Sequence, residues 1–194
     1  MSKVQIIIAS TRPGRVGPYV AEWIQKEAIA HGGFDEVEMV DLAEVNLPFM
    51  DEPNHPRLGR YEHQHTKDWS ARVASADAFV FVMPEYNYGL NAPLKNALDY
   101  LNAEWRYKVV GLASYGGVAA GTRAANMLKE VISGLKMVTP FEAVQIPFVH
   151  QFIDEEDGTF TPNEVLLAGA KAMFDEMVKL DGALKPLREA PKDV

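Results

Sequence analysis

Cysteine is absent from this chain of 194 residues. Its absence excludes disulfide bonds, thiolate metal sites, iron–sulfur clusters and a cysteine nucleophile, and it fits a reducing compartment. Long hydrophobic runs are also missing, because the longest, at residues 78–83, is far shorter than the ~18 residues that span a bilayer. The N-terminal residues lack the apolar core of a signal peptide. We therefore expect a cytoplasmic protein that does not enter a membrane.

Positive charge is scarce as well. The chain has 19 Lys and Arg against 27 Asp and Glu, which gives a net charge of −8 at pH 7. This balance argues against nucleic acid or an anionic membrane as a partner, because both attract basic surfaces. Hydrophobic residues (47%) and charged residues (24%) have the proportions of an ordinary globular protein. The length predicts one domain, placed at residues 1–185, and a loose C-terminal tail at 186–194.

Apolar runs rich in β-branched residues alternate with helical patterns along the chain. The expected strands are residues 3–9, 37–42, 77–83, 108–114 and a fifth strand within 138–146. The expected helices are residues 16–31, 66–76, a helix capped by Asn91, 122–135 and 162–181. Residues 43–64 lack periodicity and are expected to form a long loop.

Five βα units predict a doubly wound parallel sheet. Right-handed crossovers leave two strand orders open, the flavodoxin-like 2-1-3-4-5 and that of a Rossmann half. In both orders ligands bind at the carboxyl ends of the strands, near the point where the strand order reverses. The loops that follow Ala9, Met83 and Ser114 are therefore the expected ligand-binding loops.

The first of these loops, residues 9–17, joins a buried strand to a helix. It lacks both the Walker lysine and the glycines of a dinucleotide-binding turn. Free amides and the helix dipole favour an anion there, and arginine adds a bidentate cation. The loop thus predicts a site for one terminal phosphomonoester; the alternative is an ordinary turn with two solvated arginines. Its candidate ligands are Ser10, Thr11, Arg12, Arg15 and the amides of Val16 and Gly17.

The second and third loops, residues 84–93 and 114–121, differ in chemistry. The second carries two Tyr and two Asn, which suit a planar ring with a polar edge. The third carries Gly116 and Gly117, which allow close approach of the backbone to a ligand. Each loop alone is also compatible with an ordinary turn. Together with the first loop, they predict a phosphate joined to a flat heteroaromatic ring.

In these three loops the sequence resembles the NADPH-dependent FMN reductase family, which includes flavin, quinone, azo-dye and chromate reductases. Order and spacing match from the first strand to the fourth helix. The matching stretches are Ser10-Thr11-Arg12-Pro13-Gly14-Arg15, Pro84-Glu85-Tyr86-Asn87 with Leu94-Lys95-Asn96-Ala97-Leu98-Asp99, and Ser114-Tyr115-Gly116-Gly117 with Gly121-Thr122-Arg123.

The resemblance implies a flavodoxin-like three-layer sandwich with FMN as cofactor and NADPH or NADH as co-substrate. Ser10, Arg12, Arg15, Val16 and Gly17 would hold the phosphate. Pro84, Glu85, Tyr86 and Asn87 would line the isoalloxazine, and Ser114, Gly116 and Gly117 would contact its other edge and the ribityl chain. No catalytic side chain is expected, because the chemistry belongs to the flavin; a backbone N–H near Asn87 would point at its N5 atom. The resemblance also implies a homodimer or homotetramer.

Two other functions remain open at this point. One is a flavodoxin-type electron carrier without NAD(P)H oxidation, and the other is a flavin-free nucleotide-binding regulator. The two arginines of the first loop favour the reductase, because carrier flavodoxins typically bind phosphate with hydroxyls and amides. For a 2′-phosphate of NADPH, Arg15, Arg106 and Arg123 are the candidate ligands. We expect no metal site at His55, His63 and His65, because no helix fixes their spacing.

Overall fold

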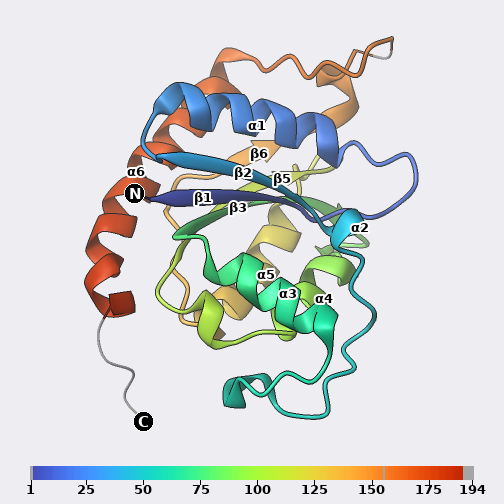
Figure 1. Cartoon of the computed structure of the whole chain (residues 1–194). Coiled ribbons are helices and arrows are strands. Elements are labelled where there is room, and N and C mark those ends of the chain that lie inside the picture. Colours follow the sequence, from blue (N-terminus) through green and yellow to red (C-terminus); the bar gives the residue numbers. More distant parts are fainter. Residues whose placement is uncertain (1, 155, 190–194) are drawn as a thin grey trace.

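A parallel sheet between two helical layers forms the described part of the chain, residues 2–154 and 156–189 of the computed structural model (Figure 1). The strand order is β2-β1-β3-β5-β6, which is the predicted order 2-1-3-4-5 and not that of a Rossmann half. The numbering differs because the short β4 pairs antiparallel with β3. The strands are β1 (Lys3–Ile8), β2 (Glu36–Asp41), β3 (Ala78–Tyr86), β4 (Gly89–Leu90), β5 (Val109–Tyr115) and β6 (Val144–Ile146).

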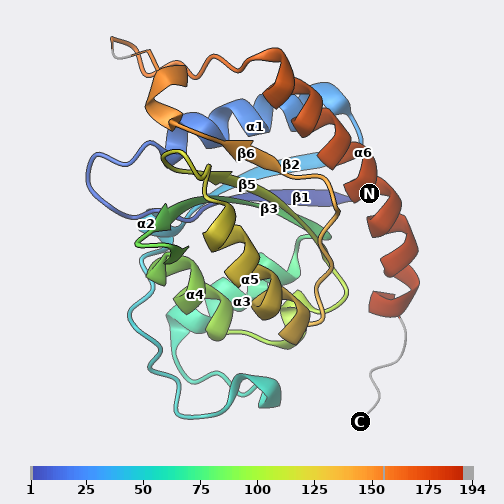
Figure 2. The same ribbon diagram turned by 180° about the vertical axis from the view of Figure 1, so that it is seen from behind.

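The helices divide between the two faces of the sheet, as the opposite views of Figures 1 and 2 show. One face is covered by α1 (Gly17–His31) and α6 (Glu164–Glu189). The other is covered by α3 (Gln64–Ala74), α4 (Ala92–Asp99) and α5 (Thr122–Gly134). Shorter helical turns lie in the connections: α2 (Leu42–Val45) and the 3₁₀ turns η1 (Pro56–Leu58), η2 (Ala103–Trp105) and η3 (Val149–Phe152).

Successive side chains of each strand point to opposite faces of the sheet, so a hydrophobic core forms on each face. In β1, Ile6 and Ile8 pack toward α1 and α6, whereas Ile7 packs toward the opposite helices. In β3, Val80 faces the first core and Phe81 the second. Both faces exclude water, so these strands are apolar throughout, as is usual in parallel sheets. Because both faces of the sheet are buried, the register of the paired strands is fixed. The carboxyl ends of β1, β3 and β5 therefore lie side by side.

Several element boundaries differ from the prediction. α3 begins at Gln64 rather than residue 66, and the expected loop at 43–64 contains α2 and η1. The fifth strand is limited to Val144–Ile146, while Val138 forms an isolated bridge to Val109. Asn91 is the N-cap residue of α4, as expected, but its side chain does not cap the helix. Instead, Asn91 Nδ2 donates to the carbonyl of Ala9 at 2.7 Å and joins the first two loops.

The last helix continues to Glu189, past the predicted end at residue 181 and through Pro186. Arg188 holds this extension against the sheet. Its guanidinium donates to Asp181 Oδ1 at 2.7 Å and to the carbonyl of Tyr107 at 3.0 Å. Residues 186–189, expected in a loose tail, are therefore helical; residues 190–194 lie outside the described part.

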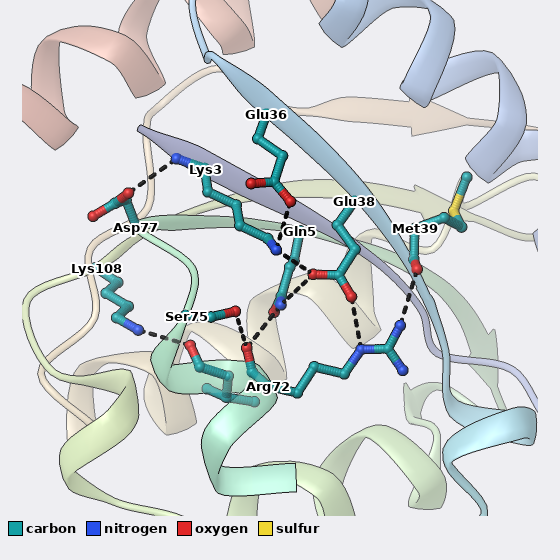
Figure 3. A network of polar contacts seen from close by, with 10 residues as sticks. Lys3, Gln5, Glu36, Glu38, Met39, Arg72, Ser75, Asp77 and Lys108 are labelled. Atoms are coloured by element: carbon teal, nitrogen blue, oxygen red, sulfur yellow. Dashed lines mark hydrogen bonds and ion pairs between the residues drawn. The ribbon is translucent and has the colours of Figure 1, made fainter. Parts of the chain in front are cut away.

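The amino-terminal edge of the sheet carries a network of ion pairs (Figure 3). Lys3 Nζ lies 2.7 Å from Glu36 and 2.9 Å from Glu38, and Arg72 Nε lies 2.8 Å from Glu38. Lys108 Nζ, nearly buried, donates to the carbonyl of Val73 at 2.8 Å at the end of α3. These charges lie at the edge opposite the predicted ligand-binding loops, so they stabilise the fold and not the site.

Candidate functional site

A cavity of about 490 Å³ lies at the carboxyl edge of the sheet. Its volume is within the range of roughly 300–1,000 Å³ usual for cofactor sites. Residues from all three predicted loops line it, together with a fourth segment, residues 148–151. The lining consists of Ser10, Arg12, Arg15, Val16, Pro84, Glu85, Tyr86, Tyr115, Gly116, Gly117, Phe148, Val149, His150 and Gln151.

One end of the cavity lies at the N-terminus of α1. Val16 is the N-cap residue of this helix and has no side-chain cap, so the first amides of α1 keep no intrahelical partner. Ser10 is fully buried beside them. Arg12 is exposed and, among the described residues, forms no ion pair. This end therefore offers amides, a hydroxyl and one uncompensated cation, which is the chemistry of a phosphate site.

Arg15, the second predicted phosphate ligand, is held by the protein itself. Its Nη1 atom donates to Asp41 Oδ1 at 2.7 Å and to the carbonyl of Ser10 at 2.6 Å. Its Nη2 atom lies 2.5 Å from Asp41 Oδ2, at the end of β2. Arg15 still lines the cavity, but its charge is balanced by Asp41. Its main task in this structure is to brace the loop.

The second loop is a tight hairpin and not the open loop expected. β3 continues through Tyr86, and Asn87 and Tyr88 form the two-residue turn to β4 with φ of 48° and 69°. Both values match a type I′ turn. Tyr86 reaches back to the first loop, with its Oη atom 2.6 Å from Ser10 Oγ. Asn87 sits exposed at the tip and is not part of the cavity lining.

Glu85, next to the turn, is paired within the same chain. Its Oε1 atom accepts from Arg123 Nη1 at 2.6 Å, and its Oε2 atom accepts from the Arg123 amide at 3.1 Å. The Arg123 guanidinium also lies 4.0 Å from the centroid of the Tyr88 ring. Glu85 thereby fixes the hairpin to the start of α5 and is not free to act as an acid or base.

The third loop meets the cavity through its glycines and Tyr115. Gly116 and Gly117 line the cavity, and a Cβ on Gly117 would meet no protein atom within 4 Å. Ser114, also predicted to contact a ligand, is buried and donates its hydroxyl to the carbonyl of Ala120 at 2.9 Å. Its hydroxyl shapes the loop. Tyr115 is a lining residue that the prediction did not include.

The fourth segment, residues 148–151, was not predicted, because it follows a strand of only three residues whose pattern is weak. β6 ends at Ile146, and parallel strands end at the same edge of a sheet. The loop after β6 therefore lies at the same edge as the other three loops. Phe148 adopts φ of 46° and is half exposed at the cavity rim. This segment adds aromatic and amide groups beside the third loop, because the amides of Phe148 and Val149 donate to the carbonyls of Gly117 and Gly116.

Two other groups lie away from the site. Arg106 ends η2, just before β5, and so lies at the opposite edge of the sheet; it is too far away to serve the cavity. His63 and His65 stack on each other with ring centroids 5.3 Å apart. His65 Nε2 lies 3.0 Å from Asp51 Oδ1.

A second cavity, of about 480 Å³, lies on the other side of the first loop. Thr11 and Phe49 are on its walls together with the start of α4. No ionisable side chain lines it, so it provides no cation for a phosphate. Thr11, a candidate ligand in the first loop, faces this second cavity and not the first. The phosphate subsite therefore belongs to the first cavity.

The first cavity fits FMN on grounds of its own structure. FMN has one phosphate, a flexible polyol and one flat ring. The N-terminus of α1 and Arg12 suit the phosphate, and the Tyr115 Oη atom is buried there without a hydrogen bond of normal geometry. Pro84, Gly116 and Gly117 leave a narrow space between two loops that suits a ring.

Comparison with known proteins agrees with this geometry. Residues 2–151 match the family model described as NADPH-dependent FMN reductase. An NAD(P)H-dependent FMN reductase of Schizosaccharomyces pombe is 43% identical over 137 residues, which cover 70% of this chain and 68% of that protein. One from Nectria sp is 32% identical over the full length of both chains.

Among solved structures, the flavoenzyme NAD(P)H:(acceptor) oxidoreductase FerB of Paracoccus denitrificans has a TM-score of 0.74 at 20% identity, covering 94% of this chain and 98% of that one. This likeness confirms the fold. The sequence match confirms the predicted enzyme class, and from both we conclude that the chain belongs to the NADPH-dependent FMN reductase family.

Proposed function

We propose that this FMN-dependent NAD(P)H oxidoreductase passes electrons to a quinone, a free flavin or a similar small planar acceptor. The observation that carries the proposal is a cavity with two unlike ends. One end is polar and cationic and lies at the start of α1, and the other is lined by Pro84, Gly116 and Gly117, with the half-exposed Phe148 at its rim. Such a cavity anchors a phosphate and leaves a ring accessible.

At the closed end, the chain would hold the phosphate through the amides of Val16 and Gly17, the Ser10 hydroxyl and Arg12. Arg15 would act mainly through the loop conformation, since Asp41 balances its charge. FMN, when bound, would supply the redox chemistry by accepting hydride and returning electrons to an acceptor. The residues of the chain would orient the ring and control access to it.

At the open end, Pro84 and the Gly116–Gly117 backbone would flank the ring, with Asn87 at the turn beside it. Phe148 stands at the rim and is 49% exposed. Tyr86, 37% exposed, extends from the hairpin toward the phosphate end, where its hydroxyl lies 2.6 Å from Ser10 Oγ. Aromatic rims favour flat, uncharged molecules over polar ones. Glu85 supplies the carboxylate among the lining residues, and its charge is neutralised by Arg123. A potato relative is named NAD(P)H:quinone oxidoreductase, which supports a quinone as acceptor.

We also propose that the chain forms a homodimer or homotetramer through the surface around the cavity mouth. Large apolar side chains are exposed there on the hairpin, the third loop and α5: Tyr88, Val118 and Met127. The sulfur of Met127 accepts from the amide of Leu90 at 3.5 Å, so hairpin and helix form one surface. Light scattering after gel filtration measures the assembly, and a monomer at micromolar concentration would refute it.

None of the described helices is long and apolar enough to cross a bilayer. The acceptor test uses the purified protein. Protein reconstituted with FMN is supplied with NADPH or NADH and with a quinone, FMN or an azo dye as acceptor. We expect quinone-dependent oxidation that requires FMN. Equal rates with and without an acceptor, after correction for oxygen, would refute the proposal for these acceptors.

A further inference from the structure

Tyr115 presents a buried hydroxyl that lacks a hydrogen-bond partner of normal geometry among the described residues. The residue ends β5, lines the first cavity and is 4% exposed. Its Oη atom makes no hydrogen bond of normal geometry, although Ser10 lies close by. A buried hydroxyl without a partner lowers the stability of a fold, and native proteins rarely keep one without a reason. The position of this hydroxyl therefore indicates a missing acceptor.

The position is fixed by Gly17, the first residue of α1. A Cβ on Gly17 would lie 2.9 Å from Tyr115 Oη and 3.2 Å from Ile8 Cγ2. The hydroxyl therefore stands directly at the helix N-terminus, where amides without intrahelical partners also point. Helix amides and an unpaired hydroxyl are both donors, so the group missing between them is an acceptor. An anion meets both needs.

The neighbouring groups identify which anion fits. The Ser10 hydroxyl and the Tyr86 hydroxyl, 2.6 Å apart, lie on one side. Arg15 is already balanced by Asp41, so Arg12 supplies the free positive charge. Burial raises the pKa of the Tyr115 phenol, which keeps it protonated and able to donate. Several donors and one free cation match a terminal phosphomonoester, whose oxygens accept many hydrogen bonds.

We propose that Tyr115 Oη donates a hydrogen bond to the 5′-phosphate of FMN and thereby makes the site select FMN over riboflavin. The inference rests on the proposed FMN site and assigns a ligand beyond the first loop. Tyr115 would thus link the third loop to the phosphate, so that phosphate binding also positions the Gly116–Gly117 backbone against the ring.

The test replaces Tyr115 with Phe, which removes the hydroxyl and keeps the ring. Dissociation constants for FMN and riboflavin are measured by fluorescence on the flavin-free full chain. Hydrogen bonds to charged groups are strong enough that FMN affinity should fall about 10- to 100-fold. Riboflavin affinity should change less than about threefold, because riboflavin has no phosphate. The matched control is Tyr107→Phe, two residues before β5 and at the opposite edge of the sheet, which should leave both constants unchanged.

Thermal unfolding of the flavin-free protein separates a binding role from a structural one. Because the hydroxyl forms no hydrogen bond of normal geometry with any described residue, Tyr115→Phe should melt at the same temperature as wild type or higher. Equal losses for FMN and riboflavin, or no loss for either, would overturn the inference while the FMN site stands. Failure of the wild-type protein to bind FMN would instead overturn the proposed function, and this inference with it.

Discussion

Two arginines in the first loop differ in what surrounds them. Arg15 makes a bidentate ion pair with Asp41, whose side chain is mostly buried and also caps α2 through the amide of Ala43. Arg12, three positions earlier, is exposed and lies 6.0 Å from the centroid of the Tyr86 ring. One guanidinium therefore stabilises the loop, and the other is available to a ligand.

Alanine at each position separates these two tasks. Arg15→Ala leaves Asp41 without its partner and should reduce the free energy of unfolding by about 2 kcal/mol in urea titrations. Arg12→Ala should change that free energy by less than about 0.5 kcal/mol but weaken FMN binding by roughly tenfold. The double variant Arg15→Ala, Asp41→Asn removes the unpaired charge but keeps an Oδ1 acceptor for the Ala43 amide, so it should recover part of the lost stability. A larger stability loss for Arg12→Ala than for Arg15→Ala would contradict these assignments.

Residue types at the site could be predicted from the sequence, whereas their partners could not. The pattern of hydroxyls, arginines and glycines predicted the three loops that supply most of the cavity lining, but not the fourth segment, residues 148–151. It did not reveal that Asp41, at the end of another strand, balances Arg15, or that Ser114 bonds Ala120. Such pairings depend on how strands align, which local sequence does not specify. Because Asp41 balances Arg15, only Arg12 offers free charge among the described residues of the loop. Two free arginines therefore do not distinguish this reductase from a carrier flavodoxin.

At the scale of elements, the end of α3 is capped by a buried ammonium group. Lys108 Nζ donates to the carbonyl of Val73 at 2.8 Å (Figure 3). It also lies 5.4 Å from the centroid of the Phe79 ring. A positive charge at a helix C-terminus interacts favourably with the helix dipole, but burial removes the hydration of the ammonium group and so disfavours its charged form. Burial lowers the pKa of Lys108 from its usual 10.5 to about 8.

This pKa predicts an unusual dependence of stability on pH. Between pH 8 and 10 the unfolded chain holds the Lys108 proton more tightly than the folded chain, so raising the pH favours folding. The gain cannot exceed about 3 kcal/mol. Above pH 10 stability should fall, because burial raises the pKa of Tyr100 to about 12 and unfolded tyrosines ionise first. Urea unfolding at successive pH values measures this curve.

The control for this curve is Lys108→Met, which replaces the ammonium group with an uncharged side chain of similar length. Without an ionisable group at this position, the rise between pH 8 and 10 should disappear. A rise of the same size in Lys108→Met would show that another group causes it. A fall in wild-type stability over this range would mean that Lys108 keeps its proton in the folded protein.

Most helices and strands could be predicted, because their apolar periodicity reflects which face they bury. The hairpin was missed for a local reason: type I′ turns usually carry Gly at the second central position, and here that position is Tyr88. The end of α6 was missed because Pro186 ordinarily signals a helix stop. Contacts of Arg188 with Asp181 and Tyr107 outweigh that signal, and both are tertiary contacts.

At the scale of the whole molecule, the two edges of the sheet have different chemistry. The amino edge is closed by ion pairs around Lys3, Glu38 and Arg72 (Figure 3). The carboxyl edge contains the cavity, the N-terminus of α1 and Arg12, which forms no ion pair with any described residue. This polarity follows from parallel strands, which bring every βα loop to one edge. The position of the cavity at this edge could be predicted from the order of elements alone. The electron acceptor could not, because its choice depends on the residues at the exposed rim of the cavity.

The central claim is that this cavity holds FMN in a form that NAD(P)H reduces. Anaerobic titration of the FMN-loaded protein with NADPH, followed by visible absorbance, tests it most directly. We predict complete loss of the oxidised flavin absorbance with one equivalent of NADPH per flavin, without accumulation of a stable semiquinone. Persistence of the oxidised spectrum with excess NADPH and with excess NADH would contradict the claim and favour an electron carrier.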